Sequence, residues 1–187
     1  MTDIFKMAAS LSEDQSDGEL PVDQWHPAHC GEMDLTIRRD GTWVYEGTPM
    51  GRPALVRLFS RVLRHDADGY VLVTPAEKLS IKVEDVPFLI VDITGNVQEG
   101  LKLRTNVGDV VTLSKDHPLD LRSGPDGVKI PYVRVRGDLW ARFGRNAYYD
   151  LVDRAEETSD GHMQITSQGA RFDLGSFQAA DKAGEGM

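Results

Sequence analysis

Apolar and polar residues alternate along most of the chain, and this pattern favours β-strands over helices. Successive side chains of a strand point to opposite faces of a sheet, so a period of two is typical of strands that are buried on one side. The strands predicted in this way cover residues 34–38, 42–46, 70–74, 78–83, 88–94, 99–105, 110–114, 128–136, 162–166 and 170–174. Asp40 and Gly41 separate the first two of these runs and predict a tight hairpin turn.

Two stretches instead repeat their apolar residues with helical spacing. The first begins at Pro53, which suits the first turn of a helix, and it predicts a helix that ends near Leu63. The second predicts a helix that ends near Val152. The apolar faces consist of Leu55, Leu58, Phe59, Val62 and Leu63 in the first helix, and of Leu139, Trp140, Phe143, Tyr148, Leu151 and Val152 in the second.

The order of these elements occurs twice along the chain. In each copy an Asp-Gly pair opens a strand, an amphipathic helix follows, and another Asp-Gly pair opens two further strands. The sequence therefore predicts an α+β fold with a mainly antiparallel sheet and a duplicated strand–helix–strand–strand unit. We expect a polar N-terminal segment at 1–20, repeat domains at 21–86 and 87–175, and a flexible tail at 176–187.

The composition of the chain argues against some classes of binding partner. The 30 acidic residues outnumber the 21 basic ones, and the net charge of −9 argues against binding to DNA or to a membrane surface. No apolar run is long enough to span a bilayer, and the first residues lack the pattern of a secretion signal. Because Cys30 is the only cysteine, no intrachain disulfide is possible and we expect a cytoplasmic protein. The oligomeric state is left open.

One segment contains several residues of types that can bind metals, namely His26, His29 and Cys30, with Asp34 close by. Pro27 argues against a helix that would align the two histidines, and no second cluster supplies the three or four ligands that zinc needs. A loop with surface histidines and a small thiol is the better interpretation. We expect no metal and no other cofactor, and the common motifs of phosphate-binding loops and hydrolases are absent.

Arginines are concentrated locally despite the acidic total. Three of them form a stripe on the first predicted helix, two share one face of a predicted strand, and two follow on the second predicted helix. In that order they are Arg57, Arg61 and Arg64, then Arg134 and Arg136, then Arg142 and Arg145. Such groups can bind an anion, or they can be solvated and paired with the surplus carboxylates.

A second polar group lies at a predicted strand junction. Thr74, Glu77 and Lys78 place a hydroxyl, a carboxylate and an ammonium group around Pro75, which breaks strand pairing. These side chains can bind a polar ligand, or they can satisfy a tight turn and a surface ion pair. The pattern favours neither interpretation.

Several long stretches resemble the bacterial family called domain of unknown function 1285. They are residues 25–37, 40–64 and 68–88 in the first half and 131–152 and 165–175 in the second. The resemblance implies a duplicated α+β architecture and a C-terminal half that is superficially like a pleckstrin-homology fold. It also implies a pocket between the halves for a nucleotide-like molecule in signalling. His26 and His29 lie at variable positions of the motif, which further weakens the metal interpretation.

We therefore expect a binding module without catalytic activity that takes a small anionic, nucleotide-like ligand between its repeats. The expected ligand-binding residues match motifs of the family: Arg52, Thr74, Glu77, Lys78, Arg134, Arg136 and Arg145. One alternative is an adaptor whose sheet edge or arginine stripe docks a protein partner. Another is an enzyme on a phosphorylated metabolite, although its candidates His26, His29, Cys30 and His65 show no partners in the sequence.

Overall fold

The computed structural model describes residues 20–27, 30–124 and 127–176, without the side chain of Cys30. The chain forms two compact units. The first contains the residues up to Leu89 together with 105–109 and 134–141, and the second contains 90–104, 110–133 and the residues from Arg142 onward. Most of the predicted N-terminal segment and of the predicted tail lies outside the described residues.

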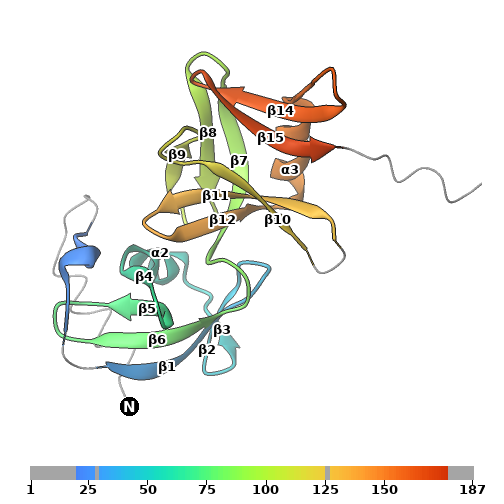
Figure 1. Ribbon diagram of the computed structural model, residues 1–187. Coiled ribbons are helices and arrows are strands. Elements are labelled where there is room, and N and C mark those ends of the chain that lie inside the picture. Colours follow the sequence, from blue (N-terminus) through green and yellow to red (C-terminus); the bar gives the residue numbers. More distant parts are fainter. Residues whose placement is uncertain (1–19, 28–29, 125–126, 177–187) are drawn as a thin grey trace, which may run out of the picture. The chain divides into compact units, whose positions relative to one another are not determined.

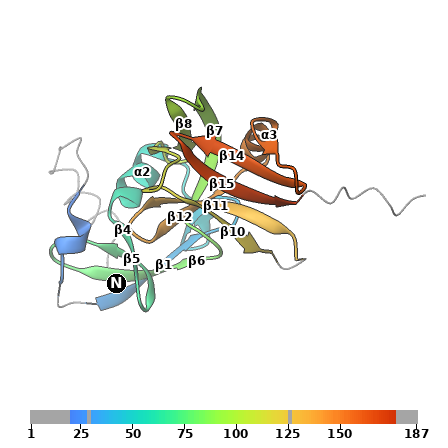
Figure 2. The ribbon, with the colours of Figure 1, turned by 45° about the horizontal axis from the view of Figure 1, so that its top comes forward.

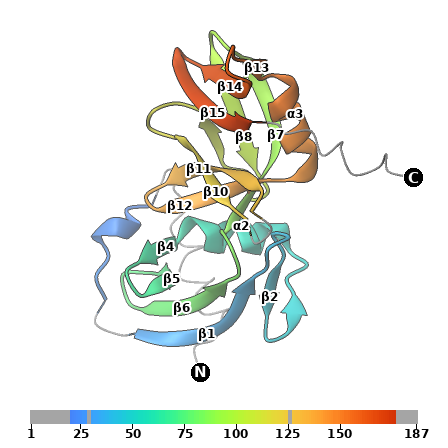
Figure 3. The same cartoon turned by 45° about the vertical axis from the view of Figure 1, so that its right-hand side comes forward.

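A six-stranded sheet forms most of the first unit (Figure 1). Its strands lie in the order β3-β2-β1-β6-β5-β4. Their bounds are β1 (Cys30–Ile37), β2 (Trp43–Tyr45), β3 (Thr48–Pro49), β4 (Leu63–Asp66), β5 (Gly69–Val73) and β6 (Lys78–Val83). The neighbours pair antiparallel except β1 and β6, which run parallel side by side (Figure 3). The predicted, mainly antiparallel sheet is confirmed.

The predicted hairpin between β1 and β2 is also confirmed. Gly41 has a φ of 83°, a conformation that glycine adopts without steric cost. The Asp40 carboxylate accepts a hydrogen bond of 2.9 Å from the backbone N–H of Thr42. This local bond closes the turn and sets the register that pairs Ile37 with Trp43.

Helix α2 (Pro53–Arg61) begins at a proline, as predicted, but it ends before Leu63. The N–H of Val62 bonds to the carbonyls of Phe59 and Ser60, which tightens the last turn. The carbonyl of Val62 then accepts a bond from Val73 of β5. Leu63 therefore starts β4, and the prediction that Arg64 continues a helical arginine stripe is wrong.

A second six-stranded sheet has the order β10-β11-β12-β7-β8-β9. Its strands are β7 (Phe88–Asn96), β8 (Gly100–Thr105), β9 (Val110–Thr112), β10 (Leu119–Ser123), β11 (Lys129–Arg136) and β12 (Leu139–Phe143). The prediction that Leu139, Trp140, Arg142 and Phe143 belong to a helix is wrong, because they form β12. Burial alternates along β12, with Leu139, Ala141 and Phe143 buried and the residues between them half-buried.

Helix α3 (Arg145–Asp153) precedes a small antiparallel sheet in the second unit, made of β13 (Glu156–Glu157), β14 (His162–Ser167) and β15 (Ala170–Ser176). Figures 1 and 2 show β14 and β15 side by side. In the first unit, α2 is likewise followed by the antiparallel strands β4, β5 and β6. The predicted α+β fold with a duplicated helix and strand order is confirmed.

Large apolar side chains form the core of the sheets. The largest side chains with no more than 2 % of their surface exposed are those of Trp43, Phe59 and Phe88. They come from β2, α2 and β7, and burial of their apolar area stabilises the fold. Within the described residues, no helix is long and apolar enough to cross a membrane.

Candidate functional site

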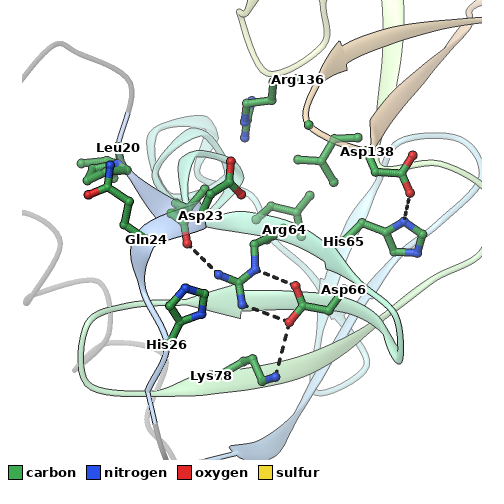
Figure 4. Close-up of a pocket in the computed structure, with 15 residues that line it drawn as sticks. Leu20, Asp23, Gln24, His26, Arg64, His65, Asp66, Lys78, Arg136 and Asp138 are labelled. Atoms are coloured by element: carbon green, nitrogen blue, oxygen red, sulfur yellow. Dashed lines mark hydrogen bonds and ion pairs between the residues drawn. The ribbon is translucent and has the colours of Figure 1, made fainter.

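A pocket of about 680 Å³ lies in the first unit (Figure 4). Its volume is in the range of small-molecule sites. One wall is the segment 20–26, which contains the short 3₁₀ helix η1 (Val22–Gln24), and the others come from β4, from Lys78 at the start of β6 and from the turn at 136–139. The lining residues are Leu20, Pro21, Val22, Asp23, Gln24, His26, Leu63, Arg64, His65, Asp66, Lys78, Arg136, Gly137, Asp138 and Leu139.

An ion-pair network connects three of these walls. Arg64 donates two hydrogen bonds to the carboxylate of Asp66, of 2.6 Å from Nε and 3.0 Å from Nη2. Its Nη1 donates to the carbonyls of Val22 and Trp25 at 2.7 and 2.9 Å. Lys78 Nζ lies 3.3 Å from Asp66 Oδ2. Arg64 therefore connects the segment 20–26 to β4, and the Asp66 carboxylate forms ion pairs with both Arg64 and Lys78.

The protonation of Asp66 follows from these contacts. The hydrogen bonds from Arg64 hold the pKa of the Asp66 carboxyl below its ordinary value, although burial acts in the opposite direction. The same bonds raise the pKa of Arg64. Both groups are thus charged at neutral pH, with 14 % and 21 % of their side chains exposed.

The low pKa of Asp66 predicts a pH-dependent stability. A carboxyl whose pKa is lower in the folded than in the unfolded chain stabilises the fold above its unfolded pKa, near 3.8, and loses this contribution as the pH falls through the folded value. We expect Asp66→Asn to be less stable than the wild type at neutral pH. The difference should shrink below pH 3.8 in urea unfolding curves. A difference that is the same at every pH would contradict the assignment.

Arg136 reaches the pocket from the end of β11. Its Nη1 donates a 2.9 Å hydrogen bond to Asp109, its Nη2 bonds to the carbonyl of Ser60, and its guanidinium lies 5.4 Å from the centre of the Phe88 ring. Only 19 % of the side chain is exposed. These contacts hold a positive charge in a fixed place at the pocket, which is what recognition of an anion requires.

A third polar contact is at the turn that follows β11. His65 Nδ1 lies 2.7 Å from Asp138 Oδ2, and the ring of His65 stacks on that of Tyr70 at 4.2 Å. Trp140 Nε1 donates to the other oxygen of Asp138 at 3.0 Å. Asp138 therefore orients the imidazole and fixes the turn.

The comparisons with known proteins agree with one another. The model of the domain of unknown function 1285, N-terminal domain, matches residues 20–86, and that of the C-terminal domain matches residues 87–174. The chain belongs to the DUF1285 family. The resemblance seen in the sequence is confirmed.

Two crystal structures of DUF1285 proteins are similar to this chain. The one from Silicibacter pomeroyi DSS-3 is 39 % identical, with a TM-score of 0.83, and the match covers 95 % of this chain and 97 % of that one. The one from Shewanella baltica OS155 is 31 % identical, with a TM-score of 0.52, over 65 % of this chain and 91 % of that one. No curated protein matches the chain.

Two of the predicted ligand-binding residues of this DUF1285 protein, Lys78 and Arg136, line the same pocket. Arg52 instead lines a smaller, more apolar pocket of about 260 Å³ beside β3 and α2. Arg134, on β11, and Arg145, at the start of α3, line neither pocket. The ligand site between the repeats that the resemblance implies stays a prediction.

Thr74 and Glu77 shape the turn between β5 and β6. The buried hydroxyl of Thr74 accepts hydrogen bonds from the backbone N–H groups of Ala76 and Glu77, at 3.3 and 3.1 Å. The backbone N–H of Thr74 donates to the carbonyl of Glu77 at 2.9 Å. This geometry fits the tight-turn interpretation and places Lys78 at the first position of β6.

The sequence interpretation missed Arg64 and Asp66 as pocket residues of this DUF1285 protein. Residues 63–66 show no alternation, because Leu63 is followed by three polar residues, and only the strand seen in the structure places Arg64 and Asp66 on one face. No group of three or more metal-ligating side chains occurs within the part that the structure describes. His29 and the side chain of Cys30 lie outside that part, so the expectation of no metal there stays a prediction.

Proposed function

We propose that this DUF1285 protein is a binding module that holds a small anionic, nucleotide-like ligand in the pocket of its first unit. The observation that carries the proposal is that Lys78 and Arg136 both line one pocket of about 680 Å³. The volume suits a nucleotide-sized molecule better than an inorganic ion. A role in signal transduction is the one that the family resemblance implies.

The two cations keep donors for a ligand. Lys78 has three N–H groups, and Asp66 takes one of them. Arg136 is held by Asp109 and the Ser60 carbonyl through one bond from each terminal nitrogen, which leaves further N–H groups of the guanidinium. Arg64 is different, because three of its nitrogens already donate to protein acceptors. We therefore assign ligand contact to Lys78 and Arg136, and support of the wall to Arg64.

The proposal predicts that nucleotides stabilise the protein through these two side chains. A ligand at one hundred times its dissociation constant adds about 2.7 kcal/mol to the free energy of unfolding, which a thermal-shift assay detects readily. We expect Lys78→Ala and Arg136→Ala to weaken binding of the stabilising nucleotide by about tenfold or more, since each removes a charged hydrogen bond.

The matched control is Lys82→Ala. Lys82 lies exposed on the same strand as Lys78 but does not line the pocket. Each variant is compared with its own ligand-free melting temperature, because Arg136→Ala also removes bonds to Asp109 and Ser60. If a nucleotide raises the melting temperatures of Lys78→Ala and Arg136→Ala as much as that of Lys82→Ala, the site is misassigned. If no nucleotide stabilises the wild type, the proposal fails.

A further inference from the structure

One carboxylate of the pocket accepts no hydrogen bond from the described part of the protein. Three aspartates line the pocket, namely Asp23, Asp66 and Asp138. Asp66 accepts hydrogen bonds from Arg64 and Lys78, and Asp138 contacts His65 and Trp140. Asp23 is exposed, and its side chain accepts no hydrogen bond from any other residue within the described ranges, although its charge contributes to the raised pKa of Arg64. Figure 4 shows it on the wall that carries η1, next to Gln24.

The pocket groups that keep hydrogen-bonding capacity for a ligand therefore have both signs. Lys78 and Arg136 offer N–H donors, whereas Asp23 offers two oxygen acceptors. A ligand that carries only negative charge would be repelled by Asp23. A ligand that presents N–H donors at a second end would instead satisfy the carboxylate, which can accept two parallel hydrogen bonds.

We propose that the ligand combines an anionic group with an edge of N–H donors that includes an amino group, and that Asp23 binds this edge. The inference rests on the proposed function, because Lys78 and Arg136 hold the anionic end. Among nucleotides, guanine presents such an edge, because its ring N–H lies beside its exocyclic amino group, whereas the amino group of adenine or cytosine lies beside a ring-nitrogen acceptor. Asp23 is then the residue that determines base specificity, whereas Lys78 and Arg136 contribute affinity for every nucleotide.

The test compares nucleotides with and without an exocyclic amino group. GMP is measured against IMP, and CMP against UMP, by titration calorimetry on the wild-type full chain. We expect the amino-bearing member of at least one pair to bind about tenfold more tightly, because a hydrogen bond to a charged acceptor is lost in the other member. Asp23→Ala should abolish this preference. The control Asp68→Ala, at an exposed aspartate outside the pocket, should keep it.

The outcomes separate this inference from the proposed function. If the two members of each pair bind equally while Lys78→Ala still binds nucleotides more weakly than the wild type, the role of Asp23 is overturned. The assignment of the anion site is then retained. A preference that survives in Asp23→Ala assigns base recognition to another residue and also overturns the inference. If none of the four nucleotides binds, both proposals fall. A preference that only Asp23→Ala abolishes supports the inference.

Discussion

Replacing Arg64 with alanine is expected to lower the free energy of unfolding by about 3 kcal/mol. The variant leaves Asp66 without its bidentate partner and deprives the carbonyls of Val22 and Trp25 of a donor. Because Arg64 and Asp66 are only 14 % and 21 % exposed, water replaces these bonds incompletely. Arg64→Lys should recover only part of the loss, since an ammonium group cannot form the same fork of bonds. Urea unfolding measures both variants.

Arg57→Ala is the control for the loss of an arginine. Arg57 lies exposed on α2 in the same unit and forms no ion pair with any described residue. Its replacement should change the free energy of unfolding by about 0.5 kcal/mol or less. Should Arg64→Ala be as mild as Arg57→Ala, the network would not be what holds the segment 20–26 in place.

Replacing Gly95 with alanine is expected to destabilise the second unit by about 3 kcal/mol or more. Gly95 lies near the end of β7 with a φ of 84°, a conformation that is strained for alanine. A Cβ atom at Gly95 would also overlap the carbonyl oxygen of Gly100 on β8. That oxygen belongs to the backbone of the paired strand, so it can move only if the hairpin is distorted.

Gly169→Ala separates the two causes of this loss. Gly169 lies in the turn between β14 and β15 of the same unit, with a φ of 75°, and a Cβ atom there meets nothing within 4 Å. Gly169→Ala should lower the free energy of unfolding by about 1 kcal/mol, because of backbone strain alone. Thermal unfolding of the two variants gives the comparison. Equal losses would show that the contact with Gly100 carries no cost.

The sequence predicted the sheets better than the ends of the helices. Alternation and the Asp-Gly turns identify strands because both depend on residues that are close together in the chain. The segment 139–143 was assigned to a helix since Leu139, Trp140 and Phe143 also fit a broad helical face. Pairing within the second sheet decides in favour of β12, and such pairing involves partners far away in the sequence.

The pocket was less predictable for the same reason. Arg64 bonds to Val22, which is 42 positions away, and His65 contacts Asp138, which is 73 positions away. Nothing in a single sequence indicates which of its arginines and aspartates meet across such distances. Lys78 and Arg136 were identified through family motifs. Arg64 was wrongly assigned to a helix, because the helix predicted to end near Leu63 ends at Arg61.

The first unit is assembled from three separate stretches of chain, and this has a consequence for protein synthesis. The ribosome makes the residues up to Leu89 early, so that the first sheet can pair while the rest is still being translated. Arg136, the last residue of β11, and Asp138 emerge only after β7 to β10. A nascent chain that has reached Val86 thus has all strands of that sheet but lacks one wall of the pocket. A recombinant fragment cut at this family boundary would be a poor substitute for the full chain in binding studies.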